Sequence, residues 1–260
     1  MRPIAELPAD EARGLSGLLF DLDDTLLDHG RLGEAAYSAL FRLRESGLSL
    51  VAVTGRPAGW GALLARQWPI DGCVTENGAV SLFREGDVLR RLDAVDEQER
   101  RRRRVRIAEI VATLQERIPE LSPADDVDAR VSDFTFDVGE RKKLRAELVD
   151  QAAELAAELG ARTTRSSVHL HVTLDGADKA SGTLAFLHHL NGVDRTIARL
   201  CHAFIGDSQN DEACFSAFRT TIGVQNLSGR PTVPPRFVTS APYGAGFAEA
   251  ARTIVERRAR

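Results

Sequence analysis

The sequence has few cysteines and no long apolar segment. Its three cysteines, Cys73, Cys201 and Cys214, are too few and too scattered for a disulfide framework, so we expect them to stay reduced. No stretch approaches the roughly 20 apolar residues that a helix needs to cross a bilayer. The N-terminus mixes acids with prolines and lacks the layout of a secretion signal. A cytoplasmic protein without a membrane partner is therefore expected.

An excess of positive charge is also absent. The formal net charge is −4, and a negative net charge disfavours binding to nucleic acid. The one basic run is Arg100–Arg104, and acidic residues precede it at Asp96, Glu97 and Glu99. Opposite charges four residues apart pair along a helix. We therefore interpret this run as a charged helix with a solvated outer face, and we expect no nucleic-acid partner.

No internal repeat and no low-complexity segment interrupts the 260 residues, 43% of which are hydrophobic. This length suffices for one large domain or two small ones. Short apolar runs end in small or acidic residues and alternate with helical patterns. Such runs are typical of parallel strands buried on both faces, and the alternation predicts a doubly wound α/β sheet. The runs are 17–21, 48–54, 73–76 and 203–207.

The middle of the chain has a different pattern. Two short strands flank Arg84–Asp87, which predicts a hairpin. An arginine-rich helix, a strand, a second helix and another strand follow. We therefore predict that residues 83–175 form an inserted α+β domain, and that residues 1–82 and 176–260 form the Rossmann-like core. The domain would join the core through two crossings, one near Phe83 and one near Asp175-Gly176.

The strongest chemical signal follows the first predicted strand, in Phe20-Asp-Leu-Asp-Asp-Thr-Leu-Leu27. In open α/β sheets, ligands bind at the carboxyl ends of strands. Asp21 and Asp23 would both lie there, one residue apart. Buried carboxylates this close repel one another unless a cation or a proton lies between them. The alternative interpretation is an acidic turn that merely ends a strand.

Three weaker patterns point to the same chemistry. Thr54 and Gly55 follow the next strand and offer a hydroxyl and a backbone N–H suited to a phosphate oxygen. Lys179 begins a helix, where its charge opposes the helix dipole unless an anion lies nearby. Asp207 and Asp211 again follow an apolar strand. Each has an ordinary alternative: a loop, a solvated lysine, or a helix cap.

Together, these patterns resemble the four motifs of the haloacid dehalogenase superfamily, in the correct order. The motifs are Asp-x-Asp-x-Thr from Asp21, a Thr after a strand at Thr54, a Lys at Lys179, and Gly-Asp-x-x-x-Asp ending at Asp211. The long insertion between Thr54 and Lys179 resembles the members that carry a type 2 cap. The resemblance implies a Rossmann-like hydrolase core that binds Mg²⁺.

Two segments, 74–79 and 206–211, resemble the subfamily IIB, or Cof-type, branch. That branch includes sucrose-phosphate, trehalose-phosphate and mannosylphosphoglycerate phosphatases, and phosphomannomutase. One departure is Asp24, where many of these relatives carry Gly. That position mainly contributes backbone, so we do not expect the change to prevent activity.

The resemblance also implies roles. Asp21 would attack phosphorus and form an aspartyl phosphate, and Asp23 would serve as general acid and then general base. Asp21, the backbone carbonyl of Asp23 and Asp207 would hold Mg²⁺, which prefers hard oxygen ligands, with Asp211 in support. Thr54, Gly55 and Lys179 would hold phosphoryl oxygens, Asn210 would position Lys179 or Asp21, and Arg56 and Asn77 are candidates near the substrate.

Histidines offer weaker signals. His169 and His171 lie on one strand face, a spacing that can bind zinc, but no carboxylate or cysteine nearby in the sequence completes a set. We interpret them as part of a half-exposed strand that faces solvent or the cleft. His29 follows the nucleophile loop, and we leave open whether it lines the entrance.

We therefore predict a Mg²⁺-dependent phosphatase acting on a small phosphorylated metabolite, such as a sugar phosphate or an ester like mannosylphosphoglycerate or sucrose phosphate. The enzyme alternative is a phosphosugar mutase of the phosphomannomutase type. An alternative of another class is a catalytically silent ligand-binding module. Dehalogenase chemistry is disfavoured by Asp23, since relatives that act on carbon–halogen bonds lack the second acid.

Overall fold

The motif-bearing strands lie side by side in one nine-stranded sheet of the computed structural model, which describes residues 1–166, 168–228 and 231–259. From β1 to β6 every pair of neighbouring strands is parallel, which confirms the predicted α/β core. The order is β1 (Arg2–Pro3), β15 (Phe237–Val238), β14 (Thr220–Gly223), β13 (His202–Gly206), β2 (Gly17–Phe20), β5 (Ser49–Val53), β6 (Gly72–Thr75), β7 (Val80–Glu85) and β8 (Val88–Asp93).

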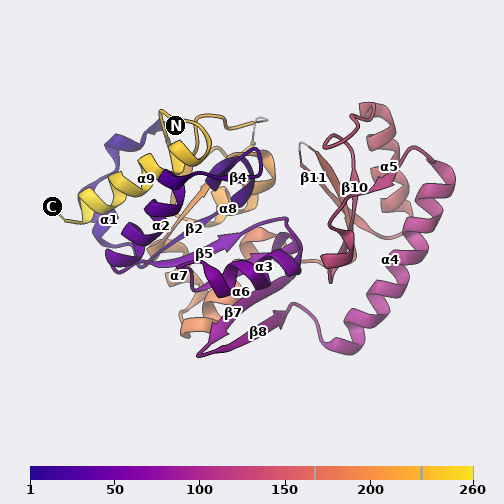
Figure 1. Ribbon diagram of the computed structural model, residues 1–260, viewed down its shortest axis with the longest axis horizontal. Coiled ribbons are helices and arrows are strands. Elements are labelled where there is room, and N and C mark those ends of the chain that lie inside the picture. Colours follow the sequence, from indigo (N-terminus) through magenta and orange to yellow (C-terminus); the bar gives the residue numbers. More distant parts are fainter. Residues whose placement is uncertain (167, 229–230, 260) are drawn as a thin grey trace.

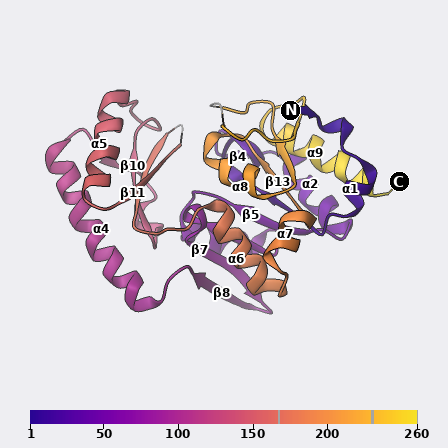
Figure 2. The ribbon, with the colours of Figure 1, turned by 180° about the vertical axis from the view of Figure 1, so that it is seen from behind.

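Helices cover both faces of this sheet. In β2, Leu18 and Phe20 face one layer while Leu19 faces the other, as expected for a strand buried on both faces. Figure 1 shows one layer and Figure 2 shows the other. The first contains α1 (Ala9–Arg13), α2 (Glu34–Glu45), α3 (Ala58–Gln67) and α9 (Tyr243–Arg258), and the second contains α6 (Lys179–Asn191), α7 (Arg195–Cys201) and α8 (Glu212–Ala217).

The strand order has a switch point at β2. The chain proceeds from β2 to β5 and β6 on one side, and later returns to build β13, β14 and β15 on the other side. Ligands of such sheets bind beyond the strand ends at this point. Asp21 follows β2 and Asp207 follows the neighbouring β13, so the switch point brings the two motifs together.

The predicted hairpin exists, but it belongs to the large sheet and not to the insertion. β7 pairs antiparallel with β6, and β8 pairs with β7. The reason is local: only residues 76–79 separate β6 from β7, and so close a connection favours antiparallel pairing. Val80 and Leu82 then pack with α3 residues such as Ala65. The first crossing therefore lies after Asp93 and not near Phe83.

A second, smaller lobe, residues 97–173, lies beside the carboxyl ends of the strands (Figure 1). We call it the cap. Its four-stranded sheet packs against two helices through an apolar core of its own, drawn entirely from residues 107–172. Its elements are α4 (Glu97–Arg117), β9 (Ser122–Pro123), β10 (Asp133–Asp137), α5 (Ala146–Glu158), β11 (Arg162–Arg165) and β12 (His169–Thr173).

The arginine run is less solvated than expected. Arg101 is exposed and pairs with Glu97 four residues before it, as predicted, and the exposed Arg102 pairs with Glu99. Arg100, however, is buried and pairs with both Asp93 and Asp175, because α4 begins where the two crossings meet. One guanidinium thus joins both connections between core and cap. Within the described residues, no helix is long and apolar enough to cross a membrane.

Candidate active site

Three buried carboxylates meet at the ends of β2 and β13. Oxygen atoms of Asp21, Asp207 and Asp211 lie within 4.8 Å of one another. Asp207 accepts a hydrogen bond from the Thr25 hydroxyl at 3.0 Å. Asp211 accepts hydrogen bonds from the backbone N–H groups of Asp207 and Ser208, at 3.0 and 3.3 Å. Asp211 therefore fixes the loop that carries Asp207.

Lys179 supplies a positive charge to this cluster. Its ammonium lies 3.1 Å from Asp21 and 2.7 Å from Asp211, and 3.4 Å from the side-chain oxygen of Asn210. The lysine is only 2% exposed. Burial by itself lowers the pKa of Lys179, but the two carboxylates outweigh it and raise that pKa well above its ordinary value. The ammonium therefore stays charged beside the oxygen of Asp21.

One lysine does not balance three acids. Burial raises the pKa of Asp21 to about 7, against the attraction of Lys179. Burial, with repulsion from Asp21 and Asp211, raises the pKa of Asp207 to about 9. Such shifts indicate a cluster that lacks positive charge. Because clustered carboxylate oxygens are the ligands that Mg²⁺ prefers, this donor set fits a divalent cation.

Asp23 lies at the edge of the cluster and is held by Arg56. The guanidinium donates two hydrogen bonds to the carboxylate, at 2.8 and 2.7 Å. Arg56 in turn lies over the ring of Trp60, 4.4 Å from its centroid, in a cation–π contact. The side chain of Asp23 is 41% exposed. Arg56, a candidate for substrate contact, is thus directly paired with the candidate acid/base residue.

The second motif forms a tight loop after β5. The Thr54 hydroxyl is fully buried and accepts a hydrogen bond from the backbone N–H of Arg56 at 3.0 Å. Gly55 lines the cavity described below, whereas Thr54 and Asn77 do not. Asn77 packs behind the loop, because a Cβ at Gly55 would lie 3.2 Å from its side-chain oxygen. Asn77 would therefore act on a substrate only indirectly, by positioning Gly55.

A cavity of about 450 Å³ opens above the acids, and both lobes line it. The core side includes the candidate residues Asp21, Asp23 and Asp207, and the cap side is polar. The lining residues from the core are Asp21, Asp23, Asp24, His29, Gly30, Gly55, Arg56, Asp207, Ser208, Asn210, Asn226, Ser228 and Tyr243, and those from the cap are Arg130, Gly139, Glu140, Ser166, Val168, His169 and His171.

The histidine strand β12 is buried, and not half-exposed as expected. His169 and His171 are 7% and 5% exposed and line the cavity, while the opposite face of the strand packs on the cap helices. His171 pairs with Asp133 at 2.9 Å, and His169 pairs with Glu140 at 3.0 Å. The sequence pattern predicted the alternation of polar and apolar residues along this strand. It could not show that both faces of the strand are buried.

The cap also contacts the core beside the cavity, through residues that the sequence did not reveal. Arg130 pairs with Asp126 and Asp133 and donates a hydrogen bond to the Gly55 carbonyl at 3.1 Å. From the core, the Glu76 carboxylate accepts hydrogen bonds from the backbone and hydroxyl of Ser132. The cap is thus joined to the loop that follows β5 and to the turn that follows β6.

Comparisons with known proteins agree with this fold. Residues 18–98 match the family model of haloacid dehalogenase-like hydrolases. A Thermoplasma acidophilum crystal structure superposes with a TM-score of 0.75 at 17% identity, covering 92% of this chain and 98% of that chain. A haloacid dehalogenase-like hydrolase from Bacteroides thetaiotaomicron gives 0.69 at 18%, covering 92% and 99%. The sucrose-phosphatase of Synechocystis sp., solved with sucrose and phosphate, gives 0.65 at 19%, covering 92% and 98%.

Proposed function

Because this chain is a haloacid dehalogenase-like hydrolase, we propose that it is a phosphatase that hydrolyses a monophosphate ester of a small metabolite, such as a sugar phosphate. The observation that carries the proposal is the arrangement of Asp21. Its carboxylate lines the cavity, lies 3.1 Å from the ammonium of Lys179, and has Asp23 two residues away at the cavity wall. A nucleophile and a second acid thus lie at one face of the cavity, and a cation contacts the nucleophile.

Two displacements at phosphorus make up the proposed reaction. In the first, an oxygen of Asp21 bonds to phosphorus while the bond to the ester oxygen breaks, and Asp23 gives its proton to that departing oxygen. In the second, Asp23 takes a proton from a water molecule whose oxygen bonds to phosphorus, and Asp21 is released. The products are an alcohol and inorganic phosphate. Lys179 holds Asp21 in place and stabilises negative charge beside phosphorus.

Asp21, Asp207 and the backbone carbonyl of Asp23 would hold Mg²⁺, with Asp211 in support. When bound, Mg²⁺ neutralises negative charge on the carboxylates and on the phosphoryl oxygens. The proposal is supported by the donor set, three buried carboxylates within 4.8 Å, and by the raised pKa of Asp207.

The cap is proposed to select the leaving group. All four motifs lie outside residues 97–173, so the core alone can transfer a phosphoryl group without recognising a particular metabolite. The cap side of the cavity offers Glu140, His169 and Ser166, which can hydrogen-bond hydroxyl groups. We propose that the core comprises residues 1–96 and 174–260, with the connections at Asp93 and Asp175 acting as the hinge.

The proposal is tested with p-nitrophenyl phosphate. We expect hydrolysis in the presence of Mg²⁺, loss of activity in excess chelator, and recovery when Mg²⁺ is restored, because three buried carboxylates converge beside the proposed phosphoryl site. Nitrophenolate release is measured by absorbance. Full turnover in excess chelator would refute metal dependence, and the absence of hydrolysis with Mg²⁺ would favour the silent binding module.

Replacing Asp23 tests the acid/base role. For alkyl phosphates, the Asp23→Asn variant should lose about 10²–10⁴-fold in turnover, the usual contribution of a general acid or base. p-Nitrophenyl phosphate needs little proton donation, so its first displacement should survive. Rapid mixing should then show a burst of one nitrophenolate per active site, followed by slow turnover. Equal losses in both displacements, with no burst, would contradict the assignment.

A further inference from the structure

Three residues on the core side of the cavity have a backbone conformation that favours glycine. Asp24, His29 and Tyr243 have φ values of 54°, 47° and 50°, and all three line the cavity. For residues with a side chain, this left-handed conformation costs free energy. Strain of this kind persists where the surrounding structure holds it, and it concentrates at functional sites.

One side chain connects two of these strained residues. The Asn226 amide donates a hydrogen bond to the Asp24 carbonyl at 2.8 Å, and its oxygen accepts one from the backbone N–H of Tyr243 at 2.7 Å. The rings of His29 and Tyr243 pack with centroids 4.9 Å apart. A His29 nitrogen lies 3.7 Å from the Asp24 carboxylate. A carboxylate and an aromatic surface are therefore fixed side by side at the cavity wall.

Glycine would satisfy the backbone at position 24 without strain. The chain instead has an aspartate there, whose side chain remains 33% exposed at the cavity. The backbone contact with Asn226 does not require this side chain, since Asn226 binds the carbonyl. The carboxylate is therefore free to face the cavity, where it lies 3.7 Å from a nitrogen of the His29 ring.

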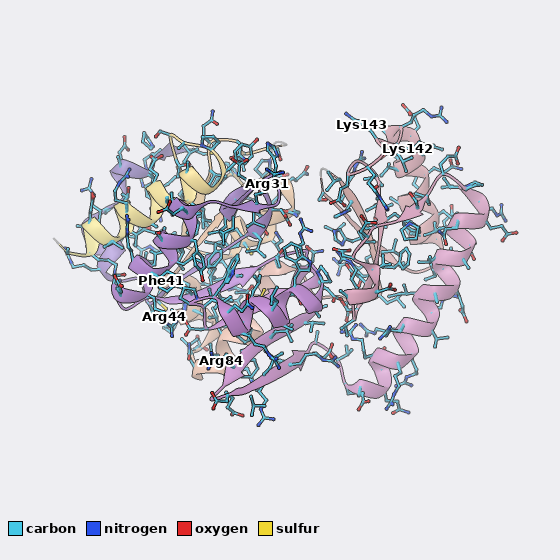
Figure 3. All side chains as sticks on the ribbon, in the orientation of Figure 1. Arg31, Phe41, Arg44, Arg84, Lys142 and Lys143 are labelled. Carbon is cyan, nitrogen blue, oxygen red and sulfur yellow. The ribbon has the colours of Figure 1, made fainter. Side chains whose placement is uncertain are left out.

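The arginines of the cavity are already neutralised. Arg56 gives two hydrogen bonds to Asp23. Arg130, whose side chain is 1% exposed, is paired with Asp126 and Asp133. Among the described residues that line the cavity, no lysine or arginine remains uncompensated. Lys142 and Lys143 lie at the top of the cap in Figure 3, and they are not part of the lining.

We propose that Asp24, with His29 and Tyr243, forms a recognition subsite for a leaving group that is uncharged and carries neighbouring hydroxyl groups. The inference rests on the proposed phosphatase function. Hydroxyl groups can donate to the Asp24 carboxylate, and the ring pair offers an apolar surface to the carbon skeleton. A second phosphate or a carboxylate on the leaving group would meet like charge and no unpaired lysine or arginine among the described residues that line the cavity. The substrate class is the monophosphate of a neutral sugar or polyol.

The test compares Asp24→Gly with wild type on glucose 6-phosphate, mannose 6-phosphate and p-nitrophenyl phosphate. The kcat/KM for the better hexose phosphate, divided by that for p-nitrophenyl phosphate, should fall about 10-fold or more, the effect of losing a hydrogen bond to a charged group. The midpoint of thermal unfolding should stay equal or rise, because glycine relieves the strain. An unchanged ratio in a folded variant would overturn the proposal.

Two further variants separate charge from hydrogen bonding. Asp24→Asn tolerates the same backbone conformation and keeps an acceptor, so it should retain most hexose phosphate activity. It should discriminate less than wild type against glucose 1,6-bisphosphate and 3-phosphoglycerate. Asp87→Gly removes an exposed carboxylate of the β7–β8 turn and should leave every ratio unchanged. Wild-type preference for either doubly charged substrate would overturn the proposal.

Calorimetry distinguishes failure of the inference from failure of the proposed function. Wild type that hydrolyses no phosphate ester would refute the phosphatase proposal alone. Binding of the two hexose 6-phosphates in the presence of Mg²⁺ would then decide the subsite. A tenfold weaker Kd in Asp24→Gly supports it, whereas an equal Kd, or no binding to wild type, overturns it.

Discussion

Asp21→Asn should reduce steady-state phosphate release by at least about 10⁴-fold, since an amide cannot form the aspartyl phosphate on which both displacements depend. Substrate binding should survive, because Lys179 and the cavity wall remain. The fold should survive as well. Burial raises the pKa of Asp21 to about 7, so the carboxylate destabilises the native state at neutral pH, and removing it leaves Lys179 paired with Asp211.

The measurement is steady-state phosphate release from p-nitrophenyl phosphate, with urea unfolding as the check on structure. Asp28→Asn is the matched control, because Asp28 lies seven residues away on an exposed part of the same loop and should leave the rate unchanged. An Asp21→Asn variant with the wild-type rate would show that Asp21 is not the nucleophile.

Lys179→Met should have the largest effect on stability. The methionine fills similar space, but Asp21 and Asp211 then lose the ammonium that lies 3.1 and 2.7 Å from them. Leaving a buried charge without its partner typically costs about 3–5 kcal/mol. We expect the free energy of unfolding, measured with urea in the absence of divalent cations, to fall by roughly this amount. Activity should also be lost, because no cation remains beside the nucleophile.

A second replacement separates charge from packing. In the double variant Lys179→Met with Asp211→Asn, one of the two uncompensated carboxylates is gone, so part of the lost stability should return. Lys142→Met, on the exposed surface of the cap, should change stability little. If the double variant is as unstable as the sum of its single variants predicts, the loss reflects packing and not unbalanced charge.

Much of the core could be predicted because its signals are local. The apolar residues of a buried strand are enough to predict that strand. The carboxyl ends of parallel strands lie at one edge of the sheet, and this rule alone predicts that Asp21 lies near Asp207. Lys179, at the start of α6, was predicted from the order of the motifs in the same way. These positions need no knowledge of the tertiary structure beyond the order of motifs along the chain.

The errors concern residues whose surroundings come from elsewhere in the chain. The hairpin of β7 and β8 has the same local pattern whether it joins the core or the cap, and its pairing with β6 decides the matter. Arg100 belongs to a charged helix by sequence, yet it is buried because Asp93 and Asp175 converge on it. Arg130 likewise depends on the distant Gly55 carbonyl. No single-sequence pattern carries such contacts.

The independent apolar core of the cap has a consequence for the order of folding. That core draws only on residues 107–172, whereas the large sheet needs segments from both sides of the insertion. Arg100 and Asp175, 75 positions apart, meet where the cap begins and ends. Closing a flexible loop of this length costs about 4 kcal/mol, and a cap that forms first through its nearby contacts has already met that cost. We expect early folding of the cap to speed assembly of the sheet that the insertion divides.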